Sequence, residues 1–363
     1  MNNLFFELIQ VSVGTRTALS AVPTPGQWRS MLSVARMQAL VGVLFDGVER
    51  LPAEQQPPED ITMLWMHWQS KIKGNNVMMD GKAREVTEVL AAGGFGSCVL
   101  KGQGTALYYP KPELRKPGDI DIWVEGGRRQ VLRYLAARYP LGSQSWHHSE
   151  VRMFEKVEVE VHHHPTWLCN PFNNRKLQRY FRESWPVQRE HSSGLGFNTP
   201  TDSFAALYCL VHIYRHLLEE GVGLRQVCDF YYIVSSLSEE QKAELLRRSA
   251  EFGTMRLLGG MMYVLREVFG VPGSALPCPA SEECGSFILK EILLAGNFGK
   301  YDRRNSVYKD EKRASRLFGR FFSRQSRFLR YFPSEVLWIL PWRFWQFFVW
   351  RPLHTVRAGR GDS

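Results

Sequence analysis

The sequence predicts an α+β fold, in which a small mixed β-sheet is flanked by helical regions at the N- and C-terminal ends. Two segments alternate polar and apolar residues, which is the period of a strand: D-I-D-I-W-V-E at 119–125 and V-E-V-E-V-H within 151–162. Residues 128–139 lie between them and have the apolar spacing of a helix. A strand, helix and strand in this order are typical of α/β and α+β proteins.

Breaks in these patterns divide the chain into four predicted regions. The first, 1–90, is helical, with its clearest periodicity at 62–90, and Gly93 and Gly94 end that helix before a short apolar strand at 97–101. The second, 91–195, contains the sheet. The third, 196–275, is helical, and Thr199 as N-cap with Pro200 at the first helical position marks its start. Helices are also expected at 224–237 and 239–252, followed by a loop at 271–284 and a basic, aromatic fourth region at 276–363.

Composition limits the classes of partner. Lys and Arg total 46 against 36 Asp and Glu, so the formal net charge is +10. This balance favours nucleotides, nucleic acid or anionic membrane without choosing among them. The 6 cysteines are dispersed and form no C-x-x-C pair, which favours reduced thiols over a zinc ribbon or a disulfide framework. We expect no signal peptide, no transmembrane helix and a cytoplasmic location, because no suitable apolar run is present.

Two carboxylates dominate the candidate site. Asp119 and Asp121 are two residues apart on a predicted strand and therefore point to the same face. Adjacent carboxylates repel each other unless a divalent cation neutralises them, and Mg²⁺ favours one or two carboxylates plus substrate phosphates. A third carboxylate is expected from the neighbouring strand, where Glu158, Glu160 and His162 share one face by the same alternation. The alternative for a lone D-x-D is a solvated strand end.

Such a triad suits phosphoryl chemistry. Two metal ions held by it would clamp a nucleoside triphosphate for in-line attack on the α-phosphorus. A glycine turn at Gly102 and Gly104 would let backbone N–H groups approach the phosphates. Lys101 and Arg115 are candidate phosphate contacts.

The order of these elements resembles the DNA polymerase β nucleotidyltransferase superfamily, in which a glycine turn precedes an acidic pair and a later acidic strand. More narrowly, residues 90–235 resemble a bacterial family of uncharacterised nucleotidyltransferase-like proteins often found near surface-polysaccharide genes. The motifs that carry this resemblance are L-K-G at 100–102, Y-P at 109–110, Arg115, D-I-D at 119–121, E-V-H at 160–162, H-I-Y-R-H at 212–216 and L-R-Q-V-C-D at 224–229.

The resemblance implies a polymerase β-like nucleotidyltransferase core and metal-dependent transfer of an NMP group from an NTP, with ATP favoured, to an unknown small-molecule, sugar or protein hydroxyl. Mg²⁺ or Mn²⁺ would be the cofactor. The implied catalytic and metal-binding residues are Asp119, Asp121 and Glu160; the implied nucleotide-binding residues are Lys101, Gly102, Gln103, Gly104, Thr105, Arg115 and His162.

One departure supports an alternative function. Gln103 stands where the superfamily commonly has serine, and Thr105 is the nearest hydroxyl that could substitute for it. The missing serine supports a catalytically degenerate nucleotide-binding regulatory module as the alternative.

Other polar residues have competing interpretations. His212 and His216 have the i, i+4 spacing of helical zinc ligands, but Ile213 replaces the glutamate of that motif, so packing, hydrogen bonding or a nucleotide-facing role is preferred. Arg225 and Asp229 form either a surface ion pair or a buried structural or nucleotide-facing pair. For His162 a role in the wall of the site is preferred over zinc binding.

The basic, aromatic segment at 303–350 also leaves alternatives open. It could contact an anionic membrane at the inner face or bind nucleic acid. It could instead be a helical segment that packs on the domain with its arginines in solvent, which is the preferred interpretation. No stable protein partner is inferred.

Overall fold

A computed structural model of the chain describes residues 2–302, 304 and 313–354 and confirms a mixed α+β fold. Five strands form one sheet in the order β1-β2-β5-β4-β3. The strands are β1 (Ser97–Val99), β2 (Ile120–Val124), β3 (Leu141–Gln144), β4 (His148–Val151) and β5 (Val159–His162). Only β2 and β5 are parallel neighbours within the described sheet, and the remaining pairs are antiparallel. The helix α6 (Arg128–Ala136) follows β2 and begins the connection to the later strands.

The hairpin of β3 and β4 was not predicted. The strand predicted within 151–162 is confirmed as β5, and the strand that ends at Val151 is a separate element. The L-G-S-Q segment of β3 lacks polar–apolar alternation because none of its residues is fully buried. A half-exposed edge strand therefore leaves no clear period in the sequence.

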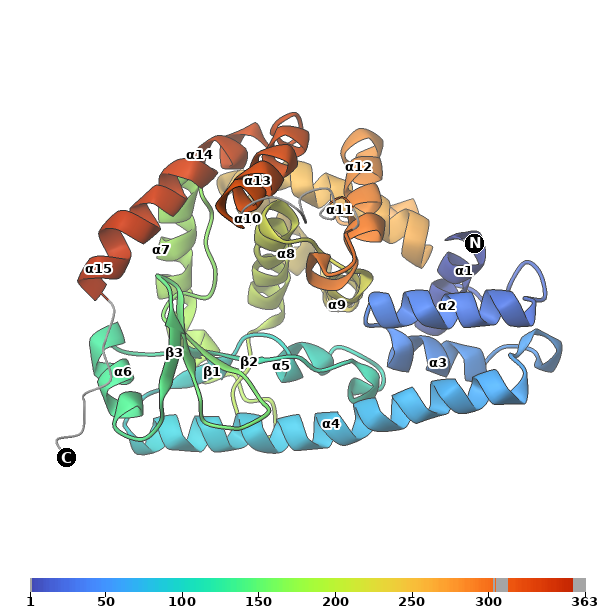
Figure 1. The fold of residues 1–363 in the computed structure, drawn as a ribbon, viewed down its shortest axis with the longest axis horizontal. Helices are drawn as coiled ribbons and strands as arrows, with labels where there is room; N and C mark the ends of the chain where they lie inside the picture. The colour runs from blue at the N-terminus through green and yellow to red at the C-terminus, as the bar shows by residue number, and fades with distance from the viewer. Residues whose placement is uncertain (1, 303, 305–312, 355–363) are drawn as a thin grey trace.

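The helix α4 (Glu59–Ala92) runs along one side of the whole molecule (Figure 1). Its first half packs against α2 (Pro25–Met37) and α3 (Val41–Glu49), through residues such as Trp65, and α3 in turn packs against α1 (Asn2–Val13). Its second half covers the sheet through Met79, Ala83, Val86 and Leu90, which recur at helical spacing. Gly74 and Gly81 do not interrupt it, since both lie on its exposed face.

Six helices, α7 to α12, lie on the other side of the sheet from α4 (Figure 1). The helix α8 begins at Asp202 with Thr201 as its N-cap, so the prediction of Thr199 as N-cap is wrong by two residues. The reason is a local pairing: the amide of Thr199 donates to the carbonyl of His191 over 2.9 Å, and the ring of His191 contacts the carbonyl of Thr199. The bounds of the six helices on this side of the sheet are α7 (Pro171–Gln188), α8 (Asp202–Glu219), α9 (Leu224–Ser236), α10 (Glu239–Glu251), α11 (Met255–Phe269) and α12 (Glu282–Ala295).

Two hydrophobic cores stabilise the structure. The smaller joins the sheet to the second half of α4. The larger joins the N-terminal helices to α7–α12, with Trp28, Trp65, Phe204 and Phe269 among its fully buried side chains. The N-terminal and the later helical regions thus share one core. The division at 90, 195 and 275 stays a prediction. Among the described residues no helix has the length and apolar character needed to span a bilayer.

The C-terminal segment packs on the domain, as the preferred interpretation expected. It comprises α13 (Arg313–Leu329), α14 (Pro333–Phe344), a π-helical turn (Trp345–Trp350) and α15 (Arg351–His354). Trp342 packs on Trp146 of the β3–β4 turn, with ring centroids 5.3 Å apart. The expectation that the arginines lie in solvent is wrong for Arg324, which is buried and donates to backbone carbonyls at the end of α8. Arg303, Lys309 and Lys312 lie outside the described residues.

Candidate active site

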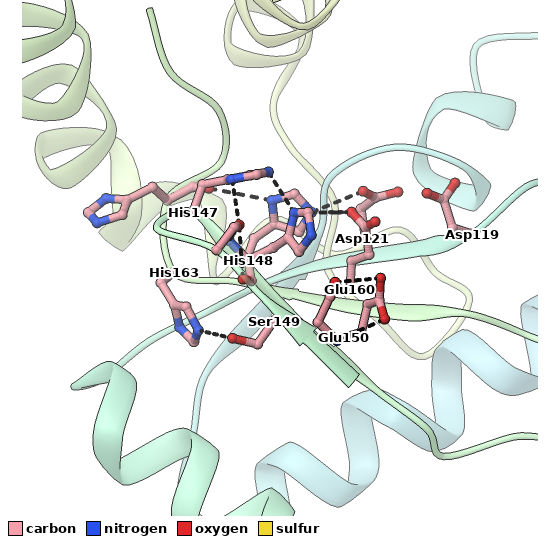
Figure 2. Close-up of polar contacts among 12 residues, drawn as sticks. Asp119, Asp121, His147, His148, Ser149, Glu150, Glu160 and His163 are labelled. Carbon is pink, nitrogen blue, oxygen red and sulfur yellow. Dashed lines mark hydrogen bonds and ion pairs between the residues drawn. The ribbon is translucent and has the colours of Figure 1, made fainter. Parts of the chain in front are cut away.

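The structure brings the three predicted carboxylates together. β2 and β5 run parallel with Asp121 opposite Glu160, and Asp119 directly precedes β2 on the same face. One carboxylate oxygen from each residue lies within 4.8 Å of the others. Figure 2 shows the three side chains converging at the end of the sheet. Parallel pairing is what aligns the two strands so that their carboxylates meet.

Two cationic side chains neutralise this cluster. Nζ of Lys101 lies 3.0 Å from Asp121 and 3.6 Å from Asp119. Nε2 of His162 lies 3.0 Å from Asp121 and 3.3 Å from Glu160. Burial disfavours the charged form of His162, but its hydrogen bonds to Asp121 and Glu160 outweigh that effect and raise its pKa to about 9. Burial also opposes the charge on Lys101, yet the three nearby carboxylates raise its pKa.

A divalent metal fits this donor set. Asp121 is fully buried, and its Oδ2 is a buried atom without a hydrogen-bond partner among the described residues. An unsatisfied buried carboxylate oxygen is costly, and a cation would satisfy it. Asp119, Asp121 and Glu160 would supply hard oxygen ligands, the type that Mg²⁺ and Mn²⁺ prefer.

A second group of side chains adjoins the triad and was missed from the sequence. His148, Glu160 and His162 also bring their ligand atoms within 4.8 Å of one another. His147 extends the group, since its Nε2 lies 2.6 Å from Nδ1 of His148 (Figure 2). Burial, partly opposed by Glu160, lowers the pKa of His148 to about 4. His148 begins β4 and His147 directly precedes it, so the sequence signal was the H-H pair itself.

The glycine turn has the backbone that the prediction required at one position. Gly102 has a φ of 67°, in the left-handed region, and an added Cβ would lie 3.1 Å from the carbonyl oxygen of Asp119. A short helix, α5 (Gln103–Ala106), follows it. Gln103 is buried and hydrogen bonds to Asp80 of α4. Gly104 packs closely against the backbone of Val99. These two residues thus support the turn from within the fold.

Thr105 and Arg115 lie in a small pocket between the sheet and α8–α9, which Lys101 and His212 also line. Arg115 is buried and makes a bidentate ion pair with Asp229, with Nε–Oδ1 at 2.7 Å and Nη2–Oδ2 at 2.8 Å. Two of the three guanidinium nitrogens thus hold Asp229, and the role of Arg115 as a phosphate contact stays a prediction.

The remaining polar pairs are also buried. Arg225 and Asp229 are 7% and 6% exposed, so the surface ion-pair interpretation is wrong. Asp229 pairs with Arg115, whereas Arg225 donates to the carbonyl of Lys116 over 3.1 Å. His216 hydrogen bonds to Glu220 over 3.2 Å, as the preferred packing and hydrogen-bonding role requires.

A mixed sheet with three carboxylates on two parallel strands, enclosed by helices, is the arrangement of a nucleotidyltransferase core. The family model described as "Uncharacterised nucleotidyltransferase" matches residues 24–270. This match covers more than half of the 363 residues, so the chain belongs to that family. The predicted family is confirmed, whereas a bacterial origin and a link to surface polysaccharides stay predictions. No curated protein and no solved structure matches the chain.

Proposed function

We propose that this protein transfers an NMP group from an NTP, with ATP favoured, to a hydroxyl of a small-molecule, sugar or protein acceptor. The observation that carries the proposal is the convergence of Asp119, Asp121 and Glu160, with a buried carboxylate oxygen still unsatisfied. The acceptor oxygen bonds to the α-phosphorus, the bond from that phosphorus to the bridging oxygen breaks, and pyrophosphate leaves. The hydroxyl proton passes to a triad carboxylate or to water.

Each residue of the site has a role in this proposal. Asp119, Asp121 and Glu160 would hold Mg²⁺ or Mn²⁺, which would supply positive charge to neutralise the phosphates and to activate the acceptor hydroxyl. The ring of His162 is fixed by the carbonyl of Pro165, 3.1 Å from its Nδ1, and so orients two of the carboxylates. Lys101 supplies a compact positive charge beside the phosphates.

Label transfer from α-labelled ATP, GTP, CTP and UTP tests the proposal, with Mg²⁺ or Mn²⁺ and a bacterial extract as the source of acceptors. A labelled product is expected from the wild-type protein and from Glu158→Gln, because Glu158 is exposed and lies outside the carboxylate cluster. Asp119→Asn/Asp121→Asn and Glu160→Gln should lose it. Equal labelling by all four proteins would refute the assignment.

A catalytically degenerate, nucleotide-binding regulatory module is the second candidate. The observation that favours it is the side chain of Gln103, which is buried against Asp80 instead of presenting a hydroxyl at the glycine turn. This function predicts metal-dependent ATP binding without label transfer to any component of the extract. The Gln103→Ser variant would then bind ATP as the wild type does, and isothermal titration calorimetry would measure this.

A peripheral contact with anionic membrane, at the inner face in a cytoplasmic protein, is a further part of the proposal. Its support is an exposed apolar face on α14 and the π-helical turn, formed by Leu337, Leu340, Phe344, Phe347 and Phe348. Arg343 and Arg351 lie on the same segment. Partitioning to vesicles containing phosphatidylserine should fall in Phe344→Ser/Phe348→Ser. Unchanged partitioning would exclude this contact, and binding to RNA alone would favour the nucleic-acid alternative.

A further inference from the structure

A further concave site is lined in part by the segment that precedes Asp119 in the chain. It is a groove of about 350 Å³ between the end of α2, the middle of α4 and the loop that leads to Asp119. Arg36, Trp68, Lys71, Lys116 and Tyr301 line it, and we name it the basic groove. Its volume is within the range of small-molecule sites, whose walls combine apolar surface with a few polar groups.

Positive charge is concentrated in the basic groove. Arg36, Lys71 and Lys116 make no ion pair with a carboxylate of the described chain, and neither does the neighbouring Lys300. Burial lowers the pKa of Lys116, and the nearby positive charges of Arg225, Lys300, Arg36 and Lys71 lower it further. Gathered like charges raise the free energy of the folded state, and a bound anion would remove that cost.

An indole ring organises two of these cations. The guanidinium carbon of Arg36 lies 4.5 Å from the ring centroid of Trp68, and Nζ of Lys71 lies 5.6 Å from it. Cation–π contacts of this kind hold the charges at the wall of the groove. Trp68 and the half-exposed Tyr301 also offer apolar surface to the carbon skeleton of a ligand.

A short segment of the chain connects the lining of the basic groove to the carboxylates. Lys116, Pro117 and Gly118 lead directly to Asp119. Arg225 fastens this segment, because its Nη1 donates to the carbonyl of Lys116 over 3.1 Å and would lie 3.6 Å from a Cβ at Gly118. Pro117, which lines the groove, is thus two residues from Asp119 along a segment that Arg225 holds in place.

We propose that the basic groove binds the phosphate group of the acceptor, so that the acceptor is a small phosphate monoester with a free hydroxyl, such as a sugar phosphate. The phosphate is anchored by Arg36, Lys71 and Lys116, and the hydroxyl is the group that attacks the nucleotide. The inference that the bound phosphate monoester is the acceptor rests on the proposed nucleotidyl transfer. The inference that the groove binds a phosphate group does not depend on that function.

Isothermal titration calorimetry on the full chain tests the binding site, with glucose 1-phosphate, inorganic phosphate and glucose as probes. We expect both phosphates to bind and glucose not to bind. Lys71→Ala/Lys116→Ala should weaken phosphate binding at least 10-fold. Lys73→Ala is the matched control, since Lys73 is exposed on the same helix and does not line the groove. Equal affinity of the wild type and the double variant would overturn the proposal.

Two further measurements separate this inference from the proposed function. ATP affinity should change less than 2-fold in Lys71→Ala/Lys116→Ala; an equal loss for ATP and glucose 1-phosphate would mean that the groove holds the triphosphate and would overturn the inference. Asp119→Asn/Asp121→Asn should still bind glucose 1-phosphate. If that variant also retained label transfer, the proposed function would fail while the phosphate site stood.

Discussion

Asp121 and Glu160 lie opposite each other on the parallel strands β2 and β5, and the ring of His162 contacts both carboxylates. The two residues are far apart in the sequence but share a face of the sheet, so the strand register alone determines their approach.

Asp121→Asn and Asp119→Asn should differ in their effect on stability. Asp121 is fully buried between Lys101 and His162, whereas the side chain of Asp119 is 26% exposed. Asp121→Asn removes the buried carboxylate that lies 3.0 Å from both Lys101 and His162 and leaves a buried amide in its place, so we expect it to lower the free energy of unfolding by about 3 kcal/mol. Asp119→Asn should lower it by less than about 1 kcal/mol. Urea unfolding without metal measures both; equal losses would contradict the difference in burial.

Mn²⁺ should stabilise the folded protein in the absence of nucleotide. A ligand that binds only the folded state adds about 2.7 kcal/mol when its concentration is 100 times its Kd. The melting temperature should therefore rise with Mn²⁺ concentration for the wild type and for Glu158→Gln. It should not rise for Glu160→Gln, which removes one ligand of the triad. A similar increase in all three proteins would place the ion elsewhere.

The ion pair of Arg115 with Asp229 should contribute strongly to stability because both partners are buried. Arg115→Ala removes the bidentate partner of the buried Asp229 carboxylate, which keeps the hydroxyl of Tyr109 at 2.6 Å, and should cost about 3–5 kcal/mol. Arg115→Lys should not restore the loss, since lysine cannot make the bidentate contact. Arg115→Met/Asp229→Leu should recover much of it. Guanidinium unfolding measures the free energy of unfolding of the three variants. Equal values for all three would contradict the prediction.

Glu335 should make stability depend on pH. Burial raises its pKa from 4.5 to about 7, although the amides of Cys169 and Asn170 donate to it and oppose the shift. Between pH 4.5 and pH 7 the folded state holds a proton that the unfolded state has released, so stability falls as pH rises through this window. The full loss is about 3 kcal/mol. The difference in unfolding free energy between pH 5 and pH 8 should shrink by this amount in Glu335→Gln; an unchanged difference would assign the dependence to other groups.

The sequence predicted the part of the site that obeys strand periodicity. Alternation placed Asp119, Asp121, Glu160 and His162 on neighbouring strands, and the structure brings them together. It could not predict the β3–β4 hairpin, because a half-exposed edge strand has no alternation. His147 and His148 were missed because β4 is the four-residue segment H-S-E-V, which has a single apolar residue and therefore no apolar alternation either.

Long-range pairing was also beyond the sequence. Local spacing suggested a contact between Arg225 and Asp229, whereas the bidentate partner of Asp229 is Arg115, from a loop before β2. The core that the N-terminal and later helices share could not be predicted either. Periodicity identifies the apolar face of a helix but not the surface that covers it.

The helix α4 fixes the rotation and the distance between the basic groove and the sheet that carries the triad. Lys71 and Trp68 of the basic groove lie on its first half, and Met79 to Leu90 support the sheet that carries the triad on its second half. Inserting one residue into an α-helix rotates everything beyond it by about 100° and shifts it by about 1.5 Å. A single alanine inserted between Gly74 and Gly81 would thus misalign acceptor and nucleotide without altering any residue that touches either.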